Sequence, residues 1–410
     1  MTLHYPKRIA LVTNWYPPKT GVAVNRMKAF ARYLSEDFEI HVFCEGAENK
    51  IEVVNERLIV HYFESKNFLD KLKSNPKDGK LLHNGKTLLR IVASKIWTDP
   101  LKKWKENTLK GLKKEHSKKP FQLVISSFSP KEPHEIVLLF KTEFPEVKWI
   151  ADMRDEMYLN QNIHGKQKVV LQKLEEKISK KVDAILSVSL PIVDAFEENY
   201  PNIQYFEEIR NGFDFDRKEE KHVSTKSADT IKIGYFGTFY GGRKPEQFFT
   251  ALLNVQDNYP KLKIEVHLVG THKNFEIPSK LHDNVIMHAP KPYLDAIDYM
   301  KTMDANLLVE PISVRKGIFT GKIFDYLAVQ KPIIAIVDST DVAADLTKEF
   351  NAGYVASFDN PKEQISILKS FIDDWSDGKV KAATDSQIDT LHRKESVNKL
   401  GLLIHKMIEQ

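Results

Sequence analysis

Short apolar runs alternate with amphipathic stretches along most of this chain. The first run, Arg8–Thr13, leads into a proline-containing loop and then into Val24–Leu34, whose apolar residues recur at helical spacing. A second apolar run follows at Phe38–Phe43. Because strand, helix and strand with short connections are typical of a βαβ unit, this region predicts a parallel sheet covered by helices.

The alternation continues to about residue 210 and predicts one Rossmann-like domain over residues 1–210. Further strands are expected at Leu123–Ser127, Val147–Asp152 and Ala184–Val188. Helices between them are expected at Glu132–Thr142 and Lys166–Lys181.

A second domain is predicted after a polar stretch, Asp214–Thr230, which is typical of a linker or loop. Its first strand, loop and helix are expected at Ile231–Phe236, Gly237–Lys244 and Pro245–Gln256. Later strands are expected at Ile264–Val269, Val285–Met287, Ala305–Val309 and Pro332–Ile336. This domain is predicted over residues 211–393, and residues 394–410 are expected to form a final amphipathic helix.

The composition is that of an ordinary globular chain, with 42 % apolar and 29 % charged residues. The single cysteine, Cys44, allows neither an intramolecular disulfide nor a cysteine-based zinc site. No apolar run approaches the ~20 residues of a membrane-spanning helix. Residues 1–7 lack the apolar core of a signal peptide, so we expect a cytoplasmic protein.

The net charge of +5 is unevenly distributed. Residues 66–119 hold 16 basic and 5 acidic residues, a balance of +11, so the rest of the chain carries −6. In this segment Leu101, Trp104, Thr108 and Leu112 share one helical face among lysines. Such a helix either lies in an anionic membrane interface or packs its apolar face on its own domain. No RNA-binding motif accompanies the charge, so no nucleic-acid partner is expected.

Two stretches of the second domain are candidates for binding a phosphorylated ligand. Residues 314–332 contain Thr320, Gly321, Lys322 and Asp325 where a helix is expected to open. Backbone N–H groups and a lysine favour a phosphate there, and a carboxylate one turn later could accept a ribose diol. An ordinary capped helix with a solvated lysine is the alternative.

The second candidate is the glycine-rich loop 237–245, which carries Arg243 directly before a helix. An arginine there could bind a diphosphate with a bidentate fork. A glycine-rich turn with surface cations is the alternative. The loop matches neither the Walker pattern nor the dinucleotide fingerprint.

Six segments together resemble the GT-B glycosyltransferases, specifically the retaining family four that builds bacterial capsule, O-antigen and exopolysaccharide chains. Two of them resemble motifs of that family closely: GYFGTFYGGR at 234–243 and TGKIFDYLA at 320–328. The other four, in chain order, are LVTNWYPPKTG at 11–21, SSFSP at 126–130, WIADMRD at 149–155 and IRNGFD at 209–214.

The resemblance implies two Rossmann-like domains facing each other across a cleft, with the final helix crossing back onto the first domain. The first domain would bind the acceptor and the second the nucleotide-sugar. In the second, Arg243 would contact the donor phosphates, together with Thr320, Gly321 and Lys322, and Asp325 would bind the ribose. Thr238 stands where the family has a second arginine, and Gly317 where it has a sugar-binding glutamate. Sugar recognition must therefore differ.

In the first domain, the resemblance implies that Gly21 lies near the transferring centre. His134, Arg154 and Asp155 match positions that face the sugar or the acceptor. The triplet 214–216, Asp-Phe-Asp, resembles a metal-binding pattern, but it lies in the stretch that resembles the family's interdomain segment. Such enzymes usually need no metal, so no metal site and no cofactor are expected.

The predicted function is transfer of a sugar, with retained configuration, from a nucleotide-sugar to a saccharide acceptor that is lipid-linked. A UDP-sugar is favoured over a GDP-sugar, and the enzyme is expected in the cytoplasm. Whether segment 67–119 contacts the inner face of the plasma membrane stays open. Two alternatives stay open: a GT-B sugar-nucleotide 2-epimerase, and a non-catalytic GT-B-like binding subunit.

Overall fold

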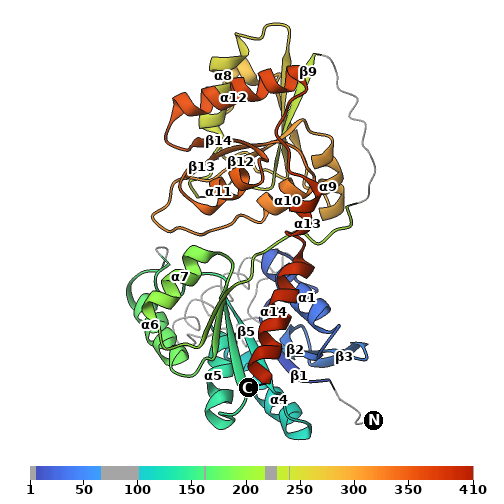
Figure 1. Cartoon of the computed structure of the whole chain (residues 1–410), viewed down its shortest axis with the longest axis vertical. Coiled ribbons are helices and arrows are strands. Elements are labelled where there is room, and N and C mark those ends of the chain that lie inside the picture. The colour runs from blue at the N-terminus through green and yellow to red at the C-terminus, as the bar shows by residue number, and fades with distance from the viewer. Residues whose placement is uncertain (1–5, 66–100, 161–162, 218–228, 240, 410) are drawn as a thin grey trace, which may run out of the picture. The chain divides into compact units, whose positions relative to one another are not determined.

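A computed structural model describes residues 6–65, 101–160, 163–217, 229–239 and 241–409 of the chain. The chain divides into two compact units. The first comprises residues 1–209 with 397–410, and the second comprises residues 210–396. Each unit is built around one sheet (Figure 1).

The sheet of the first unit has eight strands in the order β3-β4-β2-β1-β5-β6-β7-β8. All neighbours are parallel except β3 and β4. The bounds are β1 Arg8–Val12, β2 Glu39–Gly46, β3 Lys50–Asn55, β4 Leu58–Glu64, β5 Leu123–Phe128, β6 Lys148–Met153, β7 Ala184–Ser187 and β8 Tyr205–Glu208.

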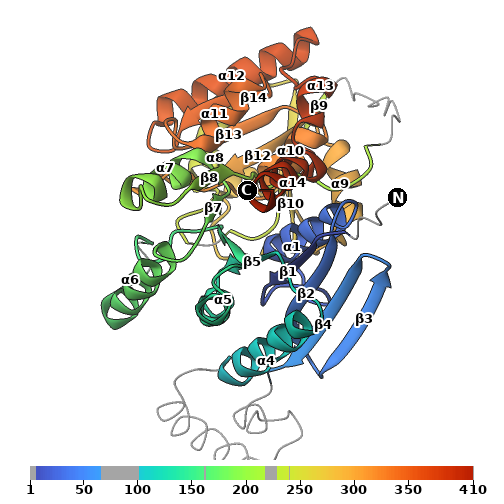
Figure 2. The same cartoon turned by 60° about the horizontal axis from the view of Figure 1, so that its bottom comes forward.

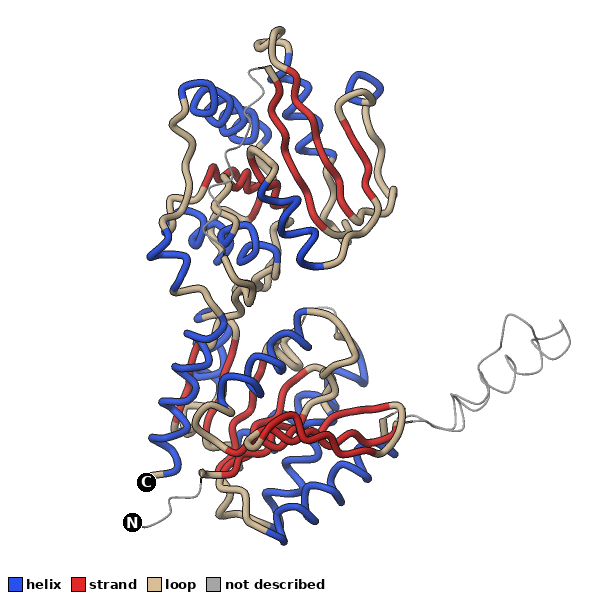
Figure 3. Tube along the Cα trace, turned by 90° about the vertical axis from the view of Figure 1, so that its right-hand side faces the viewer, coloured by secondary structure: helices blue, strands red, loops and turns tan. Residues whose placement is uncertain are grey.

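Helices cover both faces of this sheet (Figure 3), so its central strands are apolar on both sides. In β1, Ile9 and Leu11 belong to one buried cluster, whereas Ala10 and Val12 belong to another. The helices are α1 Val22–Leu34, α4 Lys102–Lys118, α5 Glu132–Glu143, α6 Gly165–Ser179 and α7 Leu190–Asn199.

The last helix, α14 (Arg393–Ile408), ends in the core of the first unit. Val397, Leu400, Ile404 and Met407 belong to the same buried cluster as Ile9 of β1. The apolar face predicted for residues 394–410 is therefore the face that packs, and the predicted return of the chain to its first domain is confirmed.

Helix α4 packs its apolar stripe on its own unit. Trp104, Thr108 and Leu112 have no exposed surface. The helix lies against β4 (Figure 2), and a Cβ on Gly111 would come within 2.2 Å of Phe63. The stripe is thus closed off from a membrane interface, so the own-domain alternative describes this helix. Residues 66–100 of the basic segment lie outside the described residues.

In the described part of the chain, no helix combines the length and the apolar character needed to cross a bilayer.

The sheet of the second unit has six parallel strands in the order β11-β10-β9-β12-β13-β14. Its strands are β9 Thr230–Phe236, β10 Lys263–Val269, β11 Val285–His288, β12 Ala305–Val309, β13 Ile333–Val337 and β14 Gly353–Ser357. Its helices are α8 Glu246–Gln256, η1 Ser279–Leu281, α9 Tyr293–Lys301, α10 Lys322–Ala328, α11 Val342–Glu349, α12 Pro361–Asp377 and α13 Asp385–Asp389.

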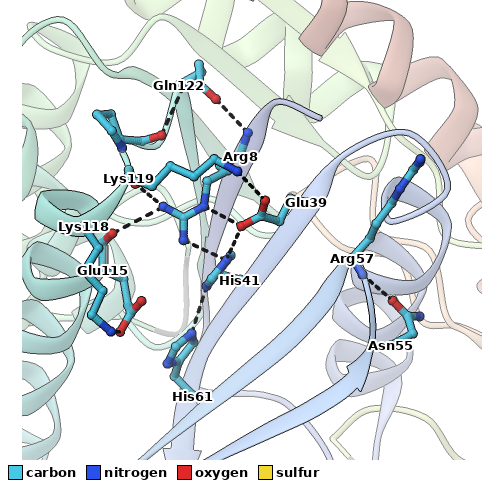
Figure 4. Close-up of polar contacts among 11 residues, drawn as sticks. Arg8, Glu39, His41, Asn55, Arg57, His61, Glu115, Lys118, Lys119 and Gln122 are labelled. Atoms are coloured by element: carbon cyan, nitrogen blue, oxygen red, sulfur yellow. Dashed lines mark hydrogen bonds and ion pairs between the residues drawn. The ribbon is translucent and has the colours of Figure 1, made fainter. Parts of the chain in front are cut away.

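A buried polar cluster joins β1, β2 and β4 near the edge where these strands begin (Figure 4). The Arg8 guanidinium donates to Glu39 at 2.6 Å and lies 2.9 Å from Nε2 of His41. Nδ1 of His41 lies 3.0 Å from Nε2 of His61. Burial lowers the pKa of His61 to about 4, and His41 adds to the decrease. Both imidazoles are therefore neutral near pH 7.

We expect acid to destabilise the first unit through His61. Its pKa is lower in the folded state than the ordinary 6.5, so the unfolded chain binds more protons and stability falls from about pH 6.5 down to about pH 4. The loss for this group is ~3 kcal/mol. Urea unfolding at several pH values measures it. His61→Phe should flatten the pH slope and His164→Gln, an exposed histidine of the same unit, should not. Equal slopes in wild type and His61→Phe would contradict the assignment.

Candidate functional site

The strand order of the second sheet reverses at β9 and β12. Strands β10 and β11 lie on one side of β9, and β12 to β14 lie on the other. In open α/β sheets, ligands bind beyond the carboxyl ends of the strands at such a switch point. Arg243 lies on the segment after β9, and Thr320, Gly321, Lys322 and Asp325 follow β12. The fold therefore brings the predicted donor residues to one end of one sheet.

Arg243 is bound to a carboxylate across this switch point. Its Nε donates to Oε2 of Glu310 at 2.6 Å, and its Nη2 lies 2.5 Å from the same oxygen. Glu310 directly follows β12, so the ion pair links the carboxyl ends of β9 and β12. A diphosphate that binds Arg243 has to share the guanidinium with Glu310 or displace it.

Lys322, the first residue of α10, is held by an aromatic ring. Its Nζ donates to the Tyr235 hydroxyl at 2.6 Å and lies 4.0 Å from the centre of that ring. Burial lowers the pKa of Lys322 to about 8; Glu310 opposes the decrease and Arg243 adds to it. The two cations and Glu310 therefore form one electrostatic group.

Gly237 keeps open the space that the Lys322 side chain occupies. Its φ is +102°, a conformation that favours glycine, and a Cβ there would lie 3.1 Å from Cε of Lys322. The group that comes closest to the Gly237 backbone in this structure is the Lys322 side chain.

Asp325 lies one turn into α10 and accepts a hydrogen bond from the Tyr293 hydroxyl at 2.7 Å. Burial raises the pKa of Asp325 to about 6, although the Tyr293 bond and the charge of Arg393 oppose the increase. A ribose diol would have to replace or join the tyrosine as a donor. Near pH 7 the carboxylate is still mostly ionised and able to accept two hydroxyl hydrogen bonds.

The loop before α10 contains Gly317, which stands where the resembled family has a glutamate. Gly317 has a φ of +83°, and its N–H donates to Oδ1 of Asp341 at 2.7 Å. Lys316 forms an ion pair with Asp338. Thr320 and Gly321 lie just before α10. Gly321 is the N-cap residue, so the helix has no side-chain capping hydrogen bond there. Two carboxylates therefore contact the backbone and side chain of this loop.

Sequence reasoning did not identify Glu310, Asp338 and Asp341 as site residues. Each directly follows, or lies within four residues of, the end of a buried parallel strand. This position could have identified them from the sequence, because the carboxyl ends of neighbouring parallel strands share one edge of the sheet, where ligands bind.

In the first unit, the predicted residue Arg154 lies beside a buried ion pair that the sequence did not reveal. Arg26 of α1 and Asp152 of β6 are 2 % and 0 % exposed, and Nη2 of Arg26 lies 2.7 Å from Oδ1 of Asp152. Arg26 also donates to the carbonyl of Ile209 at 2.6 Å, and Ser127 donates to Asp152 at 2.8 Å.

Arg154 extends this network to the loop after β5. Its Nε donates to Oγ of Ser127 at 3.2 Å, and its Nη2 donates to the carbonyl of Ser129 at 2.9 Å. Trp15, on the loop after β1, donates to the same carbonyl at 2.6 Å. Asp155, the next residue after Arg154, is partly exposed. The carboxyl ends of β1, β5 and β6 are thus tied together.

His134 differs from the position facing the sugar that the resemblance implies. It is fully buried, and its Nδ1 lies 2.6 Å from Oγ of Ser126, which also accepts from Trp149 at 2.8 Å. Burial lowers the pKa of His134 to about 3, and its Nε2 has no hydrogen-bond partner in the described structure. The imidazole is neutral and presents no face to solvent.

Gly21 lies at the start of α1 with a φ of +128°. A Cβ there would meet nothing within 4 Å, so the backbone conformation, rather than crowding, favours glycine. Gly21 is exposed, and it stays a predicted site residue.

A cavity of about 840 Å³ in the first unit lies elsewhere. Its walls come from the loop after β1, from α1 and from the β3–β4 hairpin, and they include Tyr16, Arg32 and Arg57. None of the predicted site residues lines it. The candidate donor site therefore rests on the convergence of charged groups at the switch point and not on this cavity.

We expect removal of one partner of the buried Arg26–Asp152 pair to destabilise the first unit strongly. Arg26→Met leaves a buried carboxylate without its partner, which should lower the free energy of unfolding by about 3–5 kcal/mol. Urea unfolding followed by tryptophan fluorescence measures it. Lys102→Met, in the exposed pair with Glu106, is the matched control and should cost below about 1 kcal/mol. Equal losses in the two variants would show that the buried pair has no special weight.

Comparisons with known proteins give matches in structure alone: no family model and no curated protein matches the sequence. Sucrose-phosphate synthase from Thermosynechococcus elongatus superimposes with a TM-score of 0.65 at 12 % identity, covering 98 % of this chain and 99 % of that one. The lipopolysaccharide outer core galactosyltransferase WaaB gives 0.59 at 13 % identity, covering 97 % and 99 %.

A protein from Listeria monocytogenes named as a UDP-N-acetylglucosamine 2-epimerase gives a TM-score of 0.53 at 9 % identity, covering 99 % of this chain and 97 % of that one. At these identities the matches establish the fold. The predicted fold class is confirmed: the chain has two α/β domains with parallel sheets, as in GT-B glycosyltransferases. Transferases and an epimerase share this fold, so the fold leaves the reaction open.

Proposed function

We propose that the protein is a glycosyltransferase that moves a sugar from a nucleotide-sugar to a saccharide acceptor. The observation that supports this most is the group at the switch point of the second sheet. Arg243 and Lys322 come from different segments and share Glu310 as a charged neighbour. Asp325 follows on the same helix as Lys322. Two cations followed by a carboxylate match a diphosphate followed by a ribose.

The proposed chemistry concentrates negative charge on the leaving diphosphate. The bond between the anomeric carbon and the diphosphate oxygen breaks, an acceptor hydroxyl forms the new bond, and its proton passes to the leaving phosphate. Glu310 and Tyr235 hold Arg243 and Lys322 in position before the donor binds, so the cations are already placed to stabilise that charge once the diphosphate shares or displaces Glu310. We propose retention of configuration and no requirement for a metal ion, as the sequence resemblance implies.

Donor recognition is proposed to combine a UDP moiety with an altered sugar contact. Asp325 would accept the ribose hydroxyls in place of Tyr293. Because Gly317 replaces the glutamate of the resembled family, the sugar needs other acceptors. Asp338 and Asp341 are the carboxylates that already contact this loop, and we propose them for that role.

The acceptor is proposed to be a lipid-linked saccharide of bacterial surface polysaccharide synthesis, as in the family-four enzymes that the sequence resembles. The match to a lipopolysaccharide galactosyltransferase is consistent with this choice. The first domain would bind it through Gly21, Arg154 and Asp155, whereas His134 is buried away from any acceptor. Contact with an anionic membrane is proposed for the lysine-rich segment 67–119 through its charge, because the apolar face of α4 is buried.

A nucleotide panel with matched variants tests the donor site. In a thermal-shift measurement, UDP at ~100 times its dissociation constant should stabilise the protein by ~2.7 kcal/mol. At the same concentration, GDP, CMP, ADP and dTDP should each stabilise it less. Arg243→Ala and Asp325→Ala should weaken binding at least tenfold and reduce turnover. Lys362→Ala, an exposed lysine on α12, should change neither.

The products separate the alternatives. NMR of a UDP-sugar with a saccharide acceptor should show a glycoside with the donor's anomeric configuration. An epimerised UDP-sugar would identify the epimerase, and binding without any product would identify the binding subunit. The donor site would be overturned if no nucleotide stabilised the wild-type protein. Unchanged nucleotide binding in Arg243→Ala and Asp325→Ala would overturn it equally.

The pKa of Lys322 predicts how UDP affinity depends on pH. Only the protonated ammonium attracts the diphosphate, and in the free protein its pKa is about 8. Affinity should therefore fall as pH rises from 7 to 9, by up to about tenfold. Calorimetric titration measures this. Lys322→Met should bind more weakly and lose most of the dependence, while Lys362→Met should keep it. A flat wild-type profile would contradict a contact between Lys322 and the diphosphate.

A further inference from the structure

The two sheets carry the same arrangement of a glutamate and two histidines. In the first, Glu39 and His41 lie two residues apart on β2. In the second, Glu265 and His267 lie two residues apart on β10. In both cases the glutamate carboxylate contacts Nε2 of the histidine, at 3.0 Å and 3.3 Å respectively.

The second histidine of each arrangement lies diagonally opposite on the neighbouring strand. His61 of β4 is in register with the position two residues after His41, and His288 of β11 with the position two residues after His267. In both pairs Nδ1 of the first ring lies 3.0 Å from Nε2 of the second, and the stacked rings are 5.2 Å apart. The two pairs therefore differ only in their surroundings.

The pair in the first unit is closed by a cation. Arg8 lies 2.9 Å from His41, and His41 and His61 are 3 % and 4 % exposed. Arg8 contacts Nε2 of His41, on the side of the ring away from His61, so a metal ion between Nδ1 of His41 and Nε2 of His61 would have no third ligand among these side chains.

In the second unit, a third polar atom, an oxygen, lies beside the two histidine nitrogens. The hydroxyl of Tyr299, on α9, lies 2.9 Å from Nδ1 of His267 and 3.2 Å from Nε2 of His288. Two imidazole nitrogens and a phenol oxygen from three elements therefore form a triangle with sides of 2.9–3.2 Å. Ligands of a tetrahedral zinc ion at ~2.05 Å are ~3.3 Å apart, so the triangle needs to open by only a few tenths of an ångström.

Glu265 selects the tautomer that a metal requires. Because its carboxylate accepts the Nε2–H of His267, the lone pair of Nδ1 points into the triangle. A carboxylate behind a ligating histidine is the usual second partner in zinc and copper sites. His288 and Tyr299 are partly exposed, which leaves access from solvent.

The charges around the triangle determine the affinity that we expect for a metal ion. Lys263 pairs with Glu265, and the ammonium of Lys291 lies 4.9 Å from the centre of the Tyr299 ring. Lys232 also acts on His267. These positive charges weaken the binding of a metal cation, so we expect an affinity in the micromolar range and not that of a structural zinc site.

We propose that His267, His288 and Tyr299 bind a divalent transition-metal ion, Zn²⁺ or Cu²⁺, with a fourth position open to water. Imidazole ligands favour these ions over Mg²⁺. No set of three or more histidine, cysteine, aspartate or glutamate side chains in the described residues is arranged to hold a metal. The site proposed here is of a different kind, because its third ligand is the phenol oxygen of a tyrosine.

This site adjoins the loop that carries the candidate donor residues but shares no side chain with it. The N–H of Gly270 donates to the carbonyl of His288 at 3.0 Å, and that of Gly237 donates to the carbonyl of Val269 at 2.8 Å. A bound ion would join β10, β11 and α9 at the base of the Gly237 loop. Metal binding needs no nucleotide, so it can be tested apart from the proposed function.

Calorimetric titration of untagged, metal-free protein with Zn²⁺ tests the proposal, with Mg²⁺ as the comparison ion. One equivalent of Zn²⁺ should bind and Mg²⁺ should not. Co²⁺ at the site should give the visible absorption of a tetrahedral complex. His288→Gln should weaken binding of Zn²⁺ at least tenfold and remove that absorption. Tyr299→Phe should weaken it less and shift the Co²⁺ spectrum.

His61→Gln, in the closed pair, is the matched control and should bind Zn²⁺ like the wild type. Circular dichroism of each variant verifies that it is folded, and Tyr299→Phe provides a second, milder variant if His288→Gln is not. Absence of Zn²⁺ binding below 100 μM would overturn the proposal and leave a hydrogen-bonded triad. Binding that survives both His288→Gln and Tyr299→Phe would place the ion at another histidine and overturn it equally.

Discussion

The first unit depends on the burial of the Arg26–Asp152 ion pair. Both side chains are closed off from water, and a buried charge is tolerated only with partners that replace its hydration. Those partners are Ser127 and the carbonyl of Ile209, so α1, β5, β6 and the end of the domain must meet at one point. Arg154 is then held by the same serine, so its position depends on this constraint.

The second unit meets a similar constraint in a different way. Arg243 and Lys322 lie close enough to influence each other, and like charges repel. Glu310 neutralises part of that charge, while the ring of Tyr235 supports Lys322. The free protein thus holds its cations on internal partners at the place where an anion would bind. Such an arrangement keeps cations in position without a ligand, and a diphosphate has to compete for them.

The apolar pattern predicted most of the central strands within one or two residues, because strands buried on both faces must be apolar throughout. It did not predict β3, whose six residues are all exposed and whose pairing is antiparallel. Pro245 was expected at the first helical position but precedes α8 as its cap. The stripe of α4 was identified correctly, whereas its partner was ambiguous, because an apolar face looks the same toward a membrane and toward a core.

The sequence by itself determined the two α/β domains, the return of the last helix, and the order of the loops that carry Arg243, Lys322 and Asp325. The domains follow from local periodicity, whereas the return of the last helix and the roles of the loops follow from the resemblance of six motifs to the GT-B glycosyltransferases. The tertiary structure alone decided that His134 is buried, that Asp152 pairs with Arg26, that Glu310 binds Arg243, and that Tyr299 meets two histidines. Each of these contacts joins residues from different elements, often far apart in the chain. Their burial and charge compensation are set by packing, which no local pattern encodes.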